Sequence, residues 1–196
     1  MAEIDKEYDA SMIRAAALVV KTKDPATAGI VIGKVLDGIY EDIPDTVECK
    51  KGCCFCCYSR VEITYTEAKT IETYIRMKFT GNQVKAMVKR ARSNIRKLKK
   101  FKTESKFLLR MPCPLLNTKK GECMVYVARP LLCRSTFSNS AKACENAHNN
   151  PGTEDPIPFV SGPRVMAEDL IAGIMAGEER DYKPKWIEHA ILKVFK

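Results

Sequence analysis

Long apolar runs are missing from this sequence of 196 residues. The longest, such as residues 15–20, are far shorter than the roughly 20 apolar residues of a membrane-spanning helix, so no span is predicted. Acidic Glu3 and Asp5 stand where a signal peptide carries basic residues, and no apolar segment with a cleavage site follows them. We therefore expect the protein to work in the cytoplasm.

Glycine-rich nucleotide-binding loops are also missing. The nearest approach, "GIVIGK" at residues 29–34, has too few residues between its glycines for a phosphate-binding loop, and Val35 stands where such a loop carries Ser or Thr. No dinucleotide or methyl-donor loop is apparent, and the sequence lacks the alternating strand and helix signals of an α/β enzyme. No common nucleotide-dependent enzyme class is therefore indicated.

Cysteine, by contrast, is abundant. Five of the nine cysteines lie in "CKKGCCFCC", residues 49–57. In a small secreted chain this density would favour disulfides, but thiols stay reduced in the cytosol and a dense cluster there more often binds metal. Cysteines that act as small buried hydrophobes suit isolated positions better than five in nine. The cluster therefore predicts a metal centre.

The first three ligands of that centre are predicted by the spacing C-x3-C-x2-C of Cys49, Cys53 and Cys56. Three thiolates can wrap around one centre if the chain turns tightly after Gly52. Successive side chains of extended backbone point to opposite sides, so Cys56 and Cys57 serve different metals, or one of them is no ligand, if this stretch is extended. The other candidates for the fourth ligand are Cys113, Cys123, Cys133 and Cys144.

The donor set favours iron over zinc. Structural zinc sites typically draw four ligands from two C-x2-C knuckles, and this chain does not contain two. A cysteine-only run with further cysteines downstream is typical of an iron–sulfur cluster, here of the 4Fe–4S type, although soft thiolates also bind zinc. His148 lies four residues after Cys144 and completes a site if that stretch is helical; the alternative is a surface histidine.

Helical spacing of apolar residues runs through most of the remaining sequence. Three helix starts carry capping signals: Asp24 before a proline, Thr64 with Glu67 three residues later, and Asn82 after the stop signal Gly81. We expect helices over residues 3–20, 24–39, 64–79, 82–98, 165–175 and 184–194. The predicted fold is mainly α, with helices around an irregular cysteine-rich metal-binding centre and little β structure.

A single domain over residues 1–196 is predicted from this length and pattern. It comprises N-terminal helices over residues 1–45, a cysteine-rich metal-binding core over 46–148, a loop over 149–163 and C-terminal helices over 164–196.

Positive charge is concentrated between Arg76 and Arg110. This stretch has thirteen Lys or Arg residues and one acidic residue, a balance of +12, whereas the whole chain carries +9. Such a helix can neutralise the phosphates of nucleic acid or dock on an acidic partner. The plainer alternative is a solvated helix face opposite a buried stripe. Aromatic residues are sparse there, which disfavours stacking on single-stranded bases.

Four blocks, "CKKGCCFCC", "VEITYTEAKTI", "CPLL" and "GECMVYVARPLLCR", occur in this order between residues 48 and 144. In this combination the chain resembles the CxxCxxCC family of zinc- or iron-chelating proteins, to which the flagellin lysine-N-methylases are related. One departure is the gap of three residues between Cys49 and Cys53, where the family's name implies two; a longer gap resembles the methylase branch. The resemblance leaves Cys54 at a variable position and implies metal ligands at Cys49, Cys53, Cys56, Cys57, Cys113, Cys123 and Cys133, with Cys144 as a late addition.

Two arginines match the "RPxxCR" block of the family, Arg129 and Arg134, and the resemblance implies that they bind the cofactor. Arginines that flank Cys133 would also offset the negative charge of clustered thiolates, and their planar donors can bond carbonyls near the site. The alternative is that both are ordinary surface residues.

The predicted function is the binding of a metal or an iron–sulfur cluster, with the downstream role left open. A cluster-dependent enzyme is one alternative, either lysine methylase-like or of the radical S-adenosylmethionine type. The sequence matches the short cysteine motif of the radical enzymes, which includes an aromatic residue, here Phe55. Radical enzymes resemble partial barrels with the motif after the first strand, whereas helices precede it here. The other alternative is a nucleic-acid or acidic-partner binding module with a structural metal.

Overall fold

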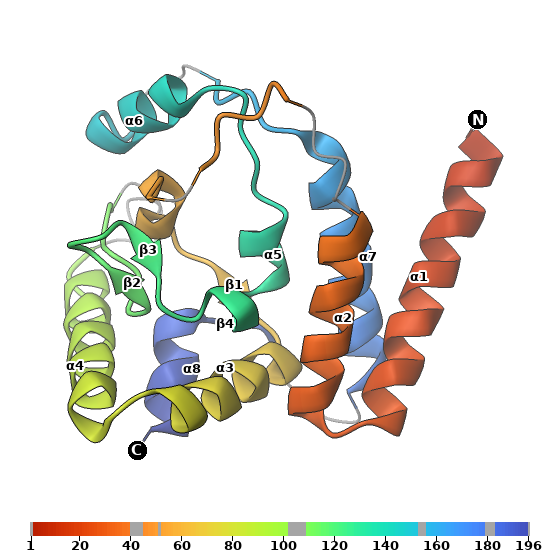
Figure 1. Cartoon of the computed structure of the whole chain (residues 1–196), viewed down its shortest axis with the longest axis horizontal. Coiled ribbons are helices and arrows are strands. Elements are labelled where there is room, and N and C mark those ends of the chain that lie inside the picture. The colour runs from red at the N-terminus through yellow and green to blue at the C-terminus, as the bar shows by residue number, and fades with distance from the viewer. Residues whose placement is uncertain are drawn as a thin grey trace.

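The computed structural model describes residues 2–39, 45–50, 52–101, 109–152, 156–178 and 183–195 (Figure 1). Within these residues helices dominate and the strands are only two residues long, which confirms the prediction of a mainly α fold. The helices are α1 Ala2–Thr22, α2 Pro25–Ile39, α3 Tyr65–Lys78, α4 Gly81–Leu98, α5 Leu131–Arg134, α6 Ala141–Asn149, α7 Ser161–Gly177 and α8 Ile187–Val194, with the short 3-10 helices η1 Phe55–Tyr58 and η3 Tyr126–Ala128.

The strands form two antiparallel pairs that fasten distant or irregular segments. Strand β1 (Glu62–Ile63) pairs with β4 (Lys185–Trp186), which ties the chain before α3 to the segment before α8. Strand β2 (Leu116–Asn117) pairs with β3 (Glu122–Cys123) in a hairpin. The strands therefore anchor loops, and they form no extended sheet within the described residues.

One half of the molecule, which we call the helical half, consists of α1, α2 and α7. The three helices enclose an apolar cluster, which includes Met12, Leu36 and Ile174 and to which Leu131 of α5 also contributes. The axes of α1 and α7 approach closely, since a Cβ atom added at Gly173 would lie 2.5 Å from the carbonyl oxygen of Ile13. Glycine at this position lets the backbones of the two helices pack in direct contact.

The other half, which we call the cysteine half, consists of α3, α4 and α8 with the cysteine-bearing segments beside them (Figure 1). Its core joins residues of the three helices, such as Ile75, Met87 and Ile191, to Leu115 and Val125 of the irregular segments. The loops of this half are thus fixed by burying their own apolar side chains among helices.

The two halves meet where α2 packs on α3. A Cβ atom at Gly29 would lie 2.0 Å from Oγ1 of Thr70, so only glycine fits at the contact. The Thr70 hydroxyl donates hydrogen bonds to the carbonyl oxygens of Thr66 (2.8 Å) and Ala26 (3.3 Å), the latter on α2.

Local capping signals predicted two of the three helix starts. Oδ1 of Asp24 accepts the amide of Thr27 at 3.2 Å, and Thr64 forms a capping box with Glu67. The prediction of Asn82 as a cap was wrong: Thr80 is the N-cap of α4, and its amide donates to Oε1 of Gln83 at 2.8 Å. Thr and Gln three residues apart are themselves a capping box, so α4 begins at the glycine that was expected to stop α3.

Two later helix boundaries also differ from expectation. Helix α7 begins at Ser161, inside the expected loop, because Pro163 falls in the first turn, where its missing N–H has no helical partner to lose. Helix α8 begins at Ile187 and not at Pro184, because the residues between them pair with β1. None of the described helices combines the length and the apolar character that crossing a bilayer requires.

Candidate metal centre

The cysteine run turns at Gly52, as its sequence predicted. This glycine has φ of +90°, and the amide of Cys53 donates to the carbonyl oxygen of Lys50 at 2.9 Å. The chain then enters η1, so Cys56 and Cys57 lie on a 3-10 turn and not in extended backbone. Side chains of adjacent residues on such a turn diverge by roughly 120°, so the two thiols do not point to opposite sides.

The segment that carries Cys113 runs beside the cysteine run of residues 49–57. The amide of Cys113 donates to the carbonyl oxygen of Cys57 at 2.8 Å, and the amide of Met111 donates to that of Tyr58 at 3.3 Å. The β2–β3 hairpin then returns the chain so that Cys123 lies opposite Leu116. Segments that are distant in sequence thereby bring three cysteines to one region.

Two polar residues of α4 hold the segment around Cys113. The guanidinium of Arg90 donates to the carbonyl oxygens of Cys113, at 3.3 Å, and of Leu116. Nδ2 of buried Asn94 donates to the carbonyl oxygen of Pro112 at 3.0 Å and to the carboxylate of Glu188 at 3.1 Å. Sequence reasoning missed both roles, although an asparagine within the apolar stripe of a helix is a signal of a buried polar contact.

Helix α5, which carries Cys133, is positioned by Glu67. One oxygen of this buried carboxyl group completes the capping box with Thr64, and the other accepts the amide of Leu131 at 2.9 Å. The same side chain therefore caps α3 and α5. The capping box was readable in the sequence, whereas the second acceptor contact spans 64 positions and carries no local signal.

Helix α6 covers the start of the cysteine run. The amide of Ser138 donates to Sγ of Cys49 at 3.3 Å, which fixes that cysteine near the helix. The ring of His148 packs on Tyr58, with 4.5 Å between ring centroids, and more loosely on Phe55 at 5.8 Å. His148 thus contacts aromatic residues of η1, and Cys144 lies one turn earlier on the same helix.

Electrostatic interactions divide the cysteines into two groups. The thiol of Cys57 interacts with those of Cys56, Cys113 and Cys133, and Cys123 interacts with Cys56 and Cys113. A second set consists of Cys49, Cys53 and Cys144, which interact with one another, and Cys49 and Cys53 also interact with Cys56. We call the first set, Cys56, Cys57, Cys113, Cys123 and Cys133, the inner thiols, and Cys49, Cys53 and Cys144 the outer thiols.

One inner thiol differs from the others in its proton affinity. A hydrogen bond from the Cys57 thiol lowers the pKa of Cys56 to about 7, and it raises the pKa of Cys57. Burial raises the pKa of Cys113 to about 12 and the pKa of Cys123 above its ordinary value. The residue Cys133 as a whole is exposed, but the protein around its thiol buries that group, and this burial raises the pKa of Cys133 well above the ordinary value. At neutral pH Cys56 is therefore the thiol that most readily becomes a nucleophile or ligand.

The two arginines of the "RPxxCR" block lie beside the inner thiols and are not free surface residues. The guanidinium of Arg134 is buried, forms an ion pair with Asp37 of α2 and donates to the carbonyl oxygen of Arg129 at 3.0 Å. Arg129 stacks over the ring of Tyr126 at 3.9 Å. Both guanidinium groups partly oppose the burial that raises the pKa of Cys123, so their charge acts on the thiols. Direct cofactor binding by them stays a prediction.

Cys54 has fewer thiol neighbours than the rest. Burial raises its pKa, with a further contribution from Cys56 alone. Its sulfur lies 3.5 Å from the place that a Cβ atom at Gly121 would occupy, on the hairpin side of the run. Within the described residues, no three His, Cys, Asp or Glu side chains are arranged closely enough to hold a metal ion. The individual ligands therefore stay predictions.

The comparison with known families supports the chemistry of this region. The sequence pattern of the CxxCxxCC family, described as "Putative zinc- or iron-chelating domain", matches residues 48–151. The chain belongs to this family. The matched residues include all eight predicted cysteine ligands and both arginines of the "RPxxCR" block. No curated protein and no solved structure gives a significant match to the chain.

The donor set of this region fits the metals of the family. All nine cysteines are free thiols, and thiolate sulfur is a ligand for both zinc and iron–sulfur clusters. The positive charges of Arg129 and Arg134 reduce the repulsion between neighbouring thiolates. The region therefore offers thiol donors, positive charge that offsets their negative charge, and a surrounding apolar core.

Proposed function

We propose that the protein binds an iron–sulfur cluster, of the 4Fe–4S type, through its inner thiols. The observation that carries this proposal is that three separate segments come together: the amide of Cys113 donates to the carbonyl oxygen of Cys57, and each of the five inner thiols affects the pKa of at least one other. With the outer thiols the region offers eight candidate sulfur donors, twice the number of ligands that one structural zinc ion uses. Such a centre would supply a cross-link between loops and a site for electron transfer.

Zinc is the competing metal, and the donor chemistry alone suits it as well. The distinguishing measurement is the composition of protein purified without oxygen. We expect iron with acid-labile sulfide and a broad visible absorption band that bleaches on reduction. Stoichiometric zinc without iron or sulfide would overturn the cluster and leave a zinc-binding protein of the same family.

The ligands are tested by a matched pair of substitutions. Cys133→Ser removes an inner thiol, and we expect it to lose the cluster, because four sulfur ligands on three segments must be satisfied together. Cys54→Ser changes a neighbouring cysteine with few thiol contacts, and it should keep full iron and sulfide content. Equal loss in both variants would mean that the inner thiols are wrongly chosen.

The outer thiols are tested with Cys49→Ser. We propose that they complete the coordination around η1, so this variant should also lose metal. If it instead loses a fixed fraction of the iron and keeps the visible spectrum, the outer thiols serve a second centre. Because free thiols persist only under reducing conditions, we propose the cytoplasm as the place where the metal is bound.

An enzymatic role is the second candidate function. The motif around Phe55 matches that of radical S-adenosylmethionine enzymes, but the strands of the described residues form only two-residue antiparallel pairs. We therefore favour a binding role over this chemistry. Addition of S-adenosylmethionine to the reduced protein is the test: a changed electron paramagnetic resonance spectrum would indicate an open iron and favour the enzyme.

A further inference from the structure

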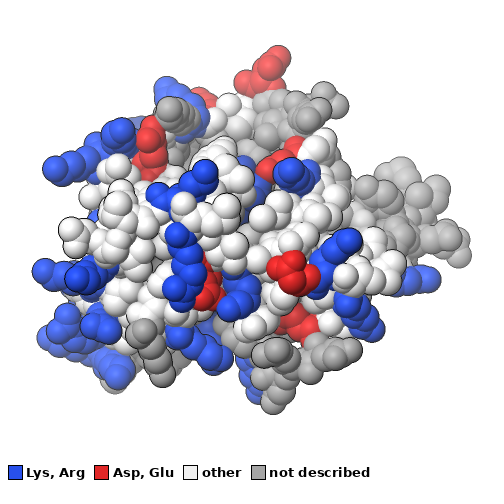
Figure 2. All heavy atoms as spheres, turned by 60° about the horizontal axis from the view of Figure 1, so that its bottom comes forward, with Lys and Arg blue, Asp and Glu red and all other residues white. Residues whose placement is uncertain are grey.

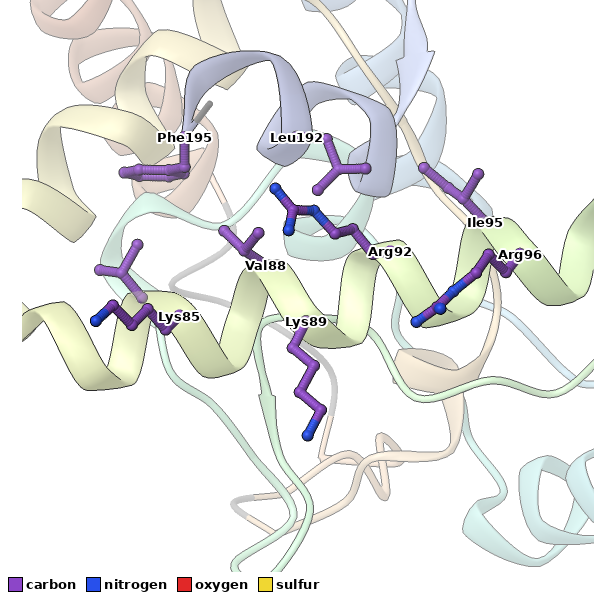
Figure 3. Close-up of a pocket in the computed structure, with 9 residues that line it drawn as sticks. Lys85, Val88, Lys89, Arg92, Ile95, Arg96, Leu192 and Phe195 are labelled. Carbon is purple, nitrogen blue, oxygen red and sulfur yellow. The ribbon is translucent and has the colours of Figure 1, made fainter.

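The basic helix α4 borders a groove that the metal centre does not use. The groove lies between α4 and α8 and has a volume of about 760 Å³ (Figure 3). Its apolar lining comes from α4, from α8 and from the residue after α8, and all of it except Ile95 belongs to the partly buried edge of the core of the cysteine half. These apolar residues are Val84, Val88, Ile95, Leu192 and Phe195.

The remaining lining residues are all cations. Figure 3 shows Arg92 reaching toward Leu192 across the groove, while Lys89 points away from α8 on the outer side of α4. None of the lining residues is acidic. The four cations, each exposed to solvent, are Lys85, Lys89, Arg92 and Arg96.

These cations have no anionic partner in the described part of the chain. Its ion pairs involve other residues, such as Arg76 with Glu72 and Arg164 with Glu168. Figure 2 shows Lys and Arg gathered along the side of the molecule on which α4 lies in Figure 1, with few acidic residues among them. The groove therefore combines an apolar floor with uncompensated positive charge.

We propose that this groove binds an acidic amphipathic helix of a protein partner. A helix that lays an apolar ridge into a groove uses anchors at i, i+3 or i+4 and i+7. The apolar positions from Val84 to Ile95 on α4 extend over about 16 Å at 1.5 Å per residue, the length of three turns of such a helix. Asp and Glu beside its apolar ridge would face the four cations, which provides charge complementarity and orientation.

The apolar floor distinguishes this partner from nucleic acid. Nucleic-acid phosphates are bound by rows of cations and backbone amides, and apolar valine and leucine side chains add no affinity for them. Binding of single strands relies on several aromatic platforms, and Phe195 is the one aromatic residue in the lining. An amphipathic peptide uses both the floor and the charges.

The test uses the whole, metal-loaded protein and a fluorescent synthetic peptide of about 18 residues, long enough to span the groove. The peptide places Leu on one helical face and Glu on the flanks. A scrambled peptide of the same composition separates the apolar face from charge alone. We expect the first peptide to bind at least about tenfold more tightly, as measured by fluorescence anisotropy, because only it can bury a continuous ridge.

Two charge-reversal variants locate the binding site. Lys89→Glu combined with Arg96→Glu changes the groove, and we expect about tenfold weaker binding with a shallower salt dependence. Lys21→Glu combined with Lys23→Glu makes the same change in charge on exposed residues at the end of α1, and it should alter the affinity by less than about twofold. Val88→Ala should weaken binding and leave its salt dependence unchanged.

Three outcomes would overturn the proposal. The scrambled peptide could bind as tightly as the amphipathic one, or the α1 control could lose as much affinity as the groove variant; either result would show that net charge alone attracts the peptide. Displacement of the peptide by duplex DNA or single-stranded RNA at lower concentration than by unlabelled peptide would assign α4 to nucleic acid. Because every variant is checked for metal content, these outcomes are independent of the proposed metal centre.

Discussion

The helical half and the cysteine half are held together in different ways. In the helical half, glycines such as Gly173 let long helices touch along their backbones, so the helices are held mainly by close packing. In the cysteine half, single polar side chains hold single loop atoms, as Glu67 holds the amide of Leu131 and Asn94 holds the carbonyl of Pro112. We infer that the first half depends on close packing and the second on a few directed bonds and on its metal.

Removal of the metal should have the largest effect and should divide the two halves. A chelator is expected to remove several kcal/mol of stability, since metal binding can provide about 10 kcal/mol or more to small thiolate sites. The loss should appear in hydrogen exchange as faster exchange of amides in residues 111–134, while amides of α1 and α7 keep their protection. Uniform loss over both halves would mean that the helical half also depends on the metal.

The pH dependence of metal binding should be steep, and its sign follows from the thiols. Because burial raises the pKa of Cys113 and Cys133 above the ordinary value, both carry protons at neutral pH and must release them to bind metal. Affinity should therefore rise by about tenfold per pH unit for each proton released, up to the raised pKa values. Competition with a chelator of known affinity at pH 6.5 and pH 8 measures this; affinity that is flat with pH would show that the ligands are already thiolates.

A substitution in the helical half should lower stability and leave the metal in place. A Cβ atom in Gly173→Ala would lie 2.5 Å from a backbone oxygen of α1 and 2.6 Å from Cβ of Ala16, so the helices must separate. We expect a loss of about 3 kcal/mol in urea unfolding, with unchanged metal content. Gly38→Ala is the matched control: no atom lies within 4 Å of its new Cβ, and it should stabilise α2 by about 0.5–1 kcal/mol. Equal effects of the two changes would contradict close packing as the cause.

A substitution in the cysteine half should lower stability and also weaken the binding of the metal. In Glu67→Gln one of the two carboxyl oxygens becomes an NH2 group, which faces either the amide of Leu131 or the amide of Thr64. The unsatisfied donor should cost about 1–3 kcal/mol. Because α5 carries Cys133, the variant should also release its metal faster to a chelator than Gly173→Ala does. A release rate equal to that of the unchanged protein would show that Glu67 caps α3 and does not position Cys133.

Local sequence predicted those features that depend on neighbouring residues. The cap at Asp24, the capping box at Thr64 and the turn at Gly52 each involve residues a few positions apart, so their signals lie within one short window. The start of α4 was wrong because two capping candidates, Thr80 and Asn82, compete within three positions, and the side chain of Gln83 decides between them.

The unpredicted features are contacts between distant positions. The pairing of Glu62 with Trp186 joins strands too short to show any periodicity, and it moves the start of α8 past its proline. Arg134 was expected at the cofactor, but its guanidinium forms an ion pair with Asp37 in the helical half as well as acting on the thiols. The cysteine spacing indicated the kind of site, whereas the residues that hold its loops could be found only from the fold.

The close pairing of α1 with α7 also bears on how the chain is made. Translation produces α1 before α7, and the glycine-bearing face that receives α1, at Gly173 and Gly177, is synthesised only after the whole cysteine-rich segment. Until then only α2 can cover the apolar stripe of α1, and the part of the stripe that faces α7 is open to chaperones or to other nascent chains. The long-range closure of this pair should therefore be a late and slow step of folding.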